Sequence, residues 1–238
     1  MFMPPSDLNR SIHISPNSVL RIVVGMAAGI VVLHSLSWLA LESGWTKARL
    51  VHLLFDLRAE GNLSSYFAAL LLLLNGILCL VSARIEEGST TERHGWLVAG
   101  LVLLFLSADE AGQVHEKLNK SMRALVGEGY GGLLKFAWVV PYSLLLTGVA
   151  AYLLPWLRRL PGVTRKGVLI AGVVYVSGAL LMELVESAQA HLDQDHVRVV
   201  VAYTVEETLE LAGQLFFLRT VLLHLQGWPG ALSIRFSS

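Results

Sequence analysis

Residues 63–83 read LSSYFAALLLLLNGILCLVSA, a run of 21 residues without a charged side chain. A helix rises ~1.5 Å per residue, so this run is about 31 Å long, close to the ~30 Å hydrocarbon core of a bilayer. Comparable apolar runs begin near Val19, Gly95, Phe136, Gly167 and Val199. The sequence therefore predicts an all-α polytopic membrane helix bundle of about six transmembrane helices.

The composition agrees with a lipid bilayer as the surroundings of this chain. Hydrophobic residues make up 54% of it and charged residues only 15%, whereas roughly a quarter of a soluble domain is charged. The 18 basic and 18 acidic residues balance, which gives no basis for a nucleic-acid partner. We expect a polar tail over residues 1–18, a single transmembrane domain over 19–225 and a short tail over 226–238.

Acidic and histidine residues mark the predicted helix ends on one membrane face. If both chain ends lie on one face, here called side A, the third and fifth helices end on the opposite face, side B. The second and sixth helices begin on side B. Topology alone therefore gathers the following residues there: Asp56, Glu60, Asp109, Glu110, His115, Glu116, Glu183, Glu186, His191, Glu206, Glu207 and Glu210.

The negative charges of this acidic layer must be neutralised. A charged side chain at the centre of a membrane helix costs ~2.5–3.5 kcal/mol on insertion scales, and less toward the interface. Helical spacing also places Tyr203, Glu207, Glu210 and Gln214 on one stripe, which should face the bundle interior or a cavity. Protons, bound cations or water are the ways in which such a stripe is neutralised.

Carboxylates beside imidazoles suit a divalent metal such as Zn, Mn or Fe, without distinguishing among them. The candidate ligands are Asp109, Glu110, His115, Glu116, Glu183, Glu186, His191, Glu206, Glu207 and Glu210, of which Glu110, Glu207 and Glu210 are also the candidate catalytic acids or bases. Glu110 and His115 are five residues apart, about 140° around a helix, so they share a face only if the helix ends or bulges there.

The spacing Glu-x-x-Gln-x-His occurs twice, at the predicted ends of the third and fifth helices. The first copy is Glu110, Gln113 and His115, and the second is Glu186, Gln189 and His191. Such a pair predicts an internal repeat of helix hairpins about an axis along the membrane normal.

Three segments carry a family resemblance: FDLRAEGN (55–62), SADEAGQVHE (107–116) and EETLE (206–210). They resemble the motifs FDLxxExN, SxDExxxxHE and EExxE of a group of uncharacterised bacterial multispan membrane proteins. The resemblance covers most of residues 51–220 and implies a location in the bacterial cytoplasmic (inner) membrane. It implies no activity. The matched motif positions are Asp56, Glu60, Asp109, Glu110, His115, Glu116, Glu206, Glu207 and Glu210.

Two classes of function fit these features. One is a metal-dependent membrane enzyme, a hydrolase or oxidoreductase, acting on a lipid or another apolar small molecule at side B. The other is a proton- or cation-coupled transporter or channel; a structural subunit of a membrane complex is a further alternative. Transport needs a site reachable from both sides, and polar groups become sparse toward side A, so the enzyme is favoured.

The positive-inside rule predicts the orientation. Ten of the 18 Lys and Arg residues fall on side A, which places both termini in the cytoplasm. Reporter fusions at Ser238 and within the 119–133 loop should therefore report opposite sides of the membrane. The same side for both would mean that a span has been miscounted.

Overall fold

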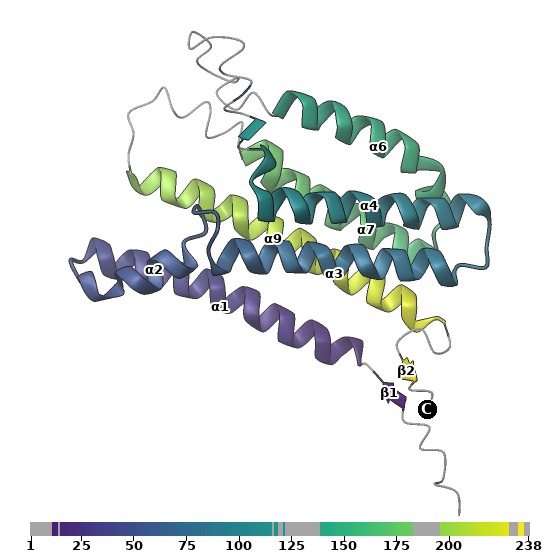
Figure 1. Ribbon diagram of the computed structural model, residues 1–238, viewed down its shortest axis with the longest axis horizontal. Coiled ribbons are helices and arrows are strands. Elements are labelled where there is room, and N and C mark those ends of the chain that lie inside the picture. Colours follow the sequence, from purple (N-terminus) through teal and green to yellow (C-terminus); the bar gives the residue numbers. More distant parts are fainter. Residues whose placement is uncertain are drawn as a thin grey trace, which may run out of the picture.

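The computed structural model describes residues 11–13, 15–115, 117–118, 121, 139–182, 196–228 and 233–235. These residues form a bundle of long helices with one short strand pair (Figure 1). Five helical segments are long and apolar enough to cross a membrane, which confirms the predicted membrane helix bundle. They are α1 (Pro16–Glu42), α3 (Leu63–Ile85), α4 (Thr90–Gly112), α7 (Gly162–Val176) with its π-helical continuation η2 (Ser177–Met182), and α9 (His196–Gln226).

The remaining elements complete the bundle. Helix α6 (Val139–Arg159) has 21 residues and lies where the fourth span was predicted. The short elements η1 (Thr46–Ala48) and α2 (Arg49–Phe55) connect α1 to the segment before α3. Strands β1 (Ser11–His13) and β2 (Ser233–Arg235) pair in antiparallel fashion. The two terminal segments therefore lie at the same end of the bundle, which is side A (Figure 1).

Side-chain caps set the ends of the two central helices. Asn62 accepts hydrogen bonds from the backbone N–H groups of Ser64 and Ser65 at the start of α3. Ser89 and Glu92 form the equivalent capping box at the start of α4. At its other end α4 stops because Gln113 adopts a left-handed conformation, with φ 55° and ψ 42°.

Close packing of α3 against α4 depends on two glycines that face each other. A Cβ atom at Gly76 would lie 3.2 Å from the carbonyl oxygen of Gly100, and one at Gly100 would lie 3.1 Å from that of Gly76. Small residues at such crossings allow membrane helices to approach closely. Around this pair, α9 packs on α1, α3, α7 and η2, while α6 packs on α4 (Figure 1).

The side-A half of the bundle is densely packed. Trp96 and Trp156 meet edge to face with ring centroids 5.1 Å apart, and both are buried. Cys79, Val221 and Leu225, all fully buried, belong to the same cluster. Apolar and aromatic side chains thus fill much of this half, and a smaller pocket of about 300 Å³ at its outer end is lined by Glu86, Glu92, Arg159 and His224.

The glycine contact can be tested by adding volume. Gly100→Val should push α3 and α4 apart and lower stability by about 1–3 kcal/mol, as overpacking does in dense cores. The thermal unfolding midpoint in detergent micelles measures the effect. Gly148→Val is the matched control, because a Cβ at Gly148 meets nothing within 4 Å. Equal midpoints for the two variants would contradict this packing.

Candidate functional site

A cavity of about 560 Å³ lies in the side-B half of the bundle, between α4, α6, α7, η2 and α9. One end of the cavity is polar. Its polar lining consists of Arg58, Glu60, Ser65, Asp109, Glu110, His115, Tyr142, Tyr175, Glu206, Glu207 and Glu210. The rest of the lining is aliphatic or aromatic and comes mainly from α4, α6 and α7. The cavity thus joins an apolar chamber to a cluster of ionisable groups.

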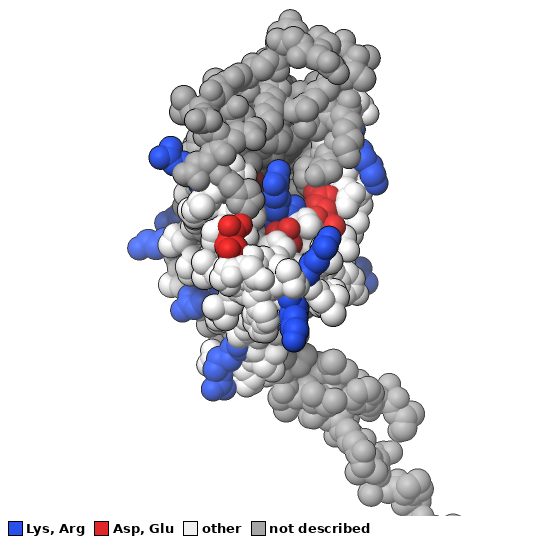
Figure 2. All heavy atoms as spheres, turned by 90° about the vertical axis from the view of Figure 1, so that its left-hand side faces the viewer, with Lys and Arg blue, Asp and Glu red and all other residues white. Residues whose placement is uncertain are grey.

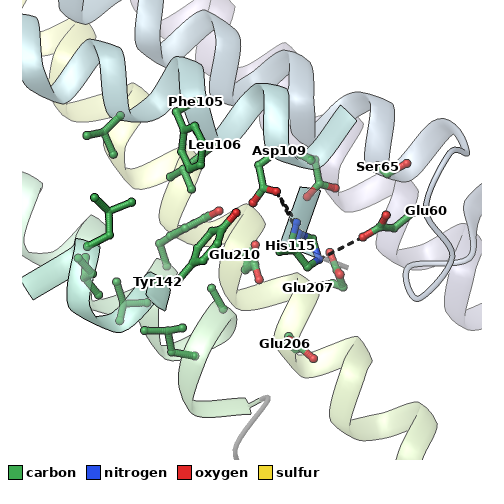
Figure 3. A pocket seen from close by; sticks show the side chains of 18 of the residues that line it. Glu60, Ser65, Phe105, Leu106, Asp109, His115, Tyr142, Glu206, Glu207 and Glu210 are labelled. Atoms are coloured by element: carbon green, nitrogen blue, oxygen red, sulfur yellow. Dashed lines mark hydrogen bonds and ion pairs between the residues drawn. The ribbon is translucent and has the colours of Figure 1, made fainter. Parts of the chain in front are cut away.

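His115 lies between two carboxylates at the polar end (Figure 3). Its Nε2 atom is 3.2 Å from Oε1 of Glu60, and its Nδ1 atom is 3.4 Å from Oδ1 of Asp109. The backbone N–H of His115 also donates to Oδ1 of Asp109 over 2.8 Å. Asp109 is buried, and the side chains of Glu60 and His115 are mostly so. The imidazole thereby joins the end of α4 to the loop before α3.

The end of α4 explains how His115 reaches its partner. Gln113 is the only non-glycine residue with positive φ in the described part of the chain, and its N–H donates to the carbonyl of Asp109. This left-handed residue turns the chain back, so that His115 returns to the last turn of its own helix. The helix therefore ends between Glu110 and His115. Their spacing had required an end or a bulge there if the two side chains are to share a face. The ionic partner on α4, however, is Asp109.

The charge state of His115 follows from these neighbours. Burial by itself would lower the pKa of the imidazole, but the hydrogen bonds and charges of Asp109 and Glu60 outweigh it and raise the pKa to about 10. His115 is therefore a cation at neutral pH. The geometry thus places an imidazolium between two carboxylates.

A second histidine, His34 on α1, holds the loop that carries Glu60. Nδ1 of this buried imidazole accepts a hydrogen bond from the N–H of Leu57 over 3.2 Å. Its Nε2 therefore carries the proton and donates to Oγ1 of Thr204 on α9, also over 3.2 Å. Asp56 lies between His34 and His52, with N–O distances of 3.6 and 3.7 Å. Helix α1 thus positions the loop of Glu60.

The acids of α9 form the opposite wall. Figure 3 shows Glu207 and Glu210 pointing from α9 toward the cavity that also holds His115. The charges of Glu207, Glu210 and Glu110 act on one another. A Cβ at Gly178 would lie 2.8 Å from the carbonyl oxygen of Glu206, so η2 packs directly on this part of α9. π-Helical turns often occur at functional sites.

The outer surface at side B carries both signs of charge. Figure 2 looks onto this end, where Asp and Glu side chains gather among Lys and Arg side chains. Arg58 is one of the basic residues of the cavity lining, with its guanidinium 5.8 Å from the ring centre of Tyr203.

The structure brings many of the candidate residues to this cavity. Those that line it are Asp109, Glu110, His115, Glu206, Glu207 and Glu210, together with the motif residue Glu60. Glu116, Glu183, Glu186 and His191 lie outside the described residues, as does the second copy of the predicted repeat. Within the described part of the chain, no group of three or more His, Cys, Asp or Glu side chains is placed to hold a metal ion. Metal binding stays a prediction.

Several residues of the site escaped the sequence analysis. His52 precedes Asp56 by four residues, a helical spacing that signals contact and that could have identified it. Tyr142 and Tyr175 lie in apolar helices, where a tyrosine is as often an interface anchor as a cavity residue. Nothing in the sequence marks these two as part of the lining.

Comparison with known proteins yields a family and no function. The model of a family described as a domain of unknown function, DUF8692, matches residues 18–225. No curated protein matches this chain. No solved structure matches it either.

The ion pairs of His115 predict a pH dependence of stability. Because its pKa is raised from the ordinary 6.5 to about 10, the folded protein keeps a proton that the unfolded chain loses. The stabilisation is complete below pH 6.5 and is lost as the pH rises through 10. We expect the thermal midpoint of wild type to exceed that of His115→Gln most below pH 6.5. A difference that stays constant up to pH 10.5 would contradict the ion pairs.

Proposed function

The chain belongs to the DUF8692 family, and we propose that it is a membrane-embedded enzyme that acts on a lipid-like substrate by acid–base catalysis at side B. The observation that carries this proposal is a cavity in which an apolar chamber meets His115 and several carboxyl groups. Ligand pockets have this character: a mostly apolar wall with a few convergent polar groups.

The carboxyl groups supply the proton transfer. Glu110, Glu207 and Glu210 all line the polar end, and their mutual repulsion makes it favourable for them to share protons. His115 pairs with Glu60 and Asp109, and these ion pairs fix the imidazole and both carboxylates at the polar end. Fixed charges act strongly in a site of low dielectric constant. Glu207 and Glu110 are the proposed acid–base pair, with Glu210 supporting Glu207.

The packing of the bundle favours an enzyme over a transporter. A transporter alternates access to a site near the membrane midplane. Here the cavity lining on α9 comes from its first half, and farther along the same helix Leu218 and Val221 are fully buried. The apolar cluster around Trp96 and Trp156 therefore lies between the cavity and the opposite membrane face.

Proton-coupled transport remains the second candidate because of two groups near the middle of the bundle. Oδ1 of Asn75 and Oε1 of Gln214 are buried and accept no hydrogen bond from the described residues. They extend the polar stripe of Glu207 and Glu210 by one turn. A proton path would need acceptors of this kind.

A divalent metal, Zn, Mn or Fe, would add Lewis-acid chemistry to the same site. Since the described residues do not provide three suitable ligands, such an ion would also depend on residues elsewhere in the chain, such as Glu183, Glu186 and His191. Elemental analysis of purified protein decides this part of the proposal.

The catalytic proposal is tested by lipid conversion. Protein reconstituted with a bacterial lipid extract should convert at least one lipid class, read by mass spectrometry. Removing a general acid or base typically costs about 10²–10⁴-fold in rate, so Glu207→Gln should nearly abolish conversion. Glu87→Gln changes an exposed glutamate on side A and should leave the rate unchanged.

The same vesicles separate the alternatives. Flux driven by a pH gradient, lost in Glu207→Gln and without any converted lipid, would replace the enzyme by a transporter. Conversion that survives Glu207→Gln would remove Glu207 from the mechanism.

A further inference from the structure

The wall of the apolar chamber is also part of the surface that faces lipid. Leu101 on α4 and Leu145 on α6 both line the cavity, yet each is 53% exposed. Phe105 and Leu146, which line it on the same two helices, are 43% and 37% exposed. A residue that borders a cavity and is half exposed stands at its opening. The chamber therefore opens sideways, across the face formed by α4 and α6.

The chamber has the depth of one leaflet. Its lining on α4 runs from Val98 to Glu110, twelve residues along the helix, which corresponds to roughly 18 Å at ~1.5 Å per residue. Half of a ~30 Å hydrocarbon core is about 15 Å. A lipid tail of the side-B leaflet would therefore lie along α4 with its head at the ionisable groups. The cavity volume, about 560 Å³, is that of a pocket for one small ligand.

The polar end selects the charge of the head. Among the described residues, six carboxyl groups line it, from Glu60, Asp109, Glu110, Glu206, Glu207 and Glu210, against two cationic side chains, Arg58 and His115. The charge of His115 already faces Glu60 and Asp109. An ammonium head carries three N–H donors for the carboxyl oxygens of Glu110 and Glu207, whereas an anionic head brings further negative charge to them. The rings of Tyr142 and Tyr175 offer further favourable contacts for a cation.

We infer that the ligand is a single-chain lipid with an ammonium head, taken sideways from the side-B leaflet across the face of α4 and α6. This inference rests on the proposed function, since it names the substrate class of the same cavity. The head lies among the carboxyl groups beside His115. The tail lies in the chamber between α4, α6 and α7.

Competition between ligands of equal chain length tests the charge of the head. The probe is tritiated dodecylamine, added to protein in nanodiscs of a zwitterionic phospholipid, with empty nanodiscs as the blank. Dodecanol and dodecyl phosphate serve as unlabelled competitors of equal chain length. We expect each of them to compete about tenfold more weakly than unlabelled dodecylamine, or worse. Competition by dodecyl phosphate as strong as that by dodecylamine would overturn the ammonium head.

Two neighbouring leucines test the sideways opening. Leu145→Trp fills the chamber and should weaken dodecylamine binding by about tenfold or more. Leu144→Trp is the matched control, because Leu144 is 71% exposed and does not line the cavity. If Leu145→Trp fails to fold, Leu101→Trp replaces it, with Leu97→Trp as its control. Equal affinities for the lining and control variants would overturn the location.

The two proposals fail in different ways. Lipid conversion that depends on Glu207 but shows no preference for amines would contradict the ammonium lipid as the ligand and support the enzyme. Selective dodecylamine binding without any lipid conversion keeps the ligand and rejects the enzyme.

Discussion

The ion pairs of His115 with Asp109 and Glu60 are the constraint around which the side-B half is organised. Removing one partner of a buried pair typically costs ~3–5 kcal/mol, because it leaves an uncompensated charge. The pairs join the end of α4 to the loop before α3, and that loop is itself held by His34 on α1. The position of the cavity acids thus depends on contacts that reach across the bundle to α1.

The helices pack closely at side A and leave a cavity at side B. At side A, the helices pack closely through the facing glycines Gly76 and Gly100 and the buried pair Trp96 and Trp156. At side B, α6 packs on α4, and the space toward α7 and η2 stays open as the cavity. A one-sided cavity of this kind suits chemistry on molecules that already reside in one leaflet.

The sequence predicted the helices well because length and apolar character are local properties. It also predicted which face the acids reach, since the number of crossings determines where each helix ends. It did not predict that His115 pairs with Asp109, because the pairing depends on the left-handed backbone of Gln113, and glutamine gives no sign of that conformation. The contact of His52 with Asp56 could be read from their spacing only if a helix is assumed there, and α2 has just seven residues.

The contacts of α1 have a consequence for biosynthesis. Within the bundle α1 packs extensively on α9, through pairs such as His34 and Thr204, and β1 before it pairs with β2 after α9. Helix α1 leaves the ribosome before α9 and β2, so α1 is exposed to lipid until these later elements are made. Its high mean hydropathy of 2.1 and its largely lipid-facing surface suit such a wait. The loop of Glu60 is anchored on α1, and Thr204 of α9 bonds the anchoring imidazole, so the site is complete only after α9 has been inserted.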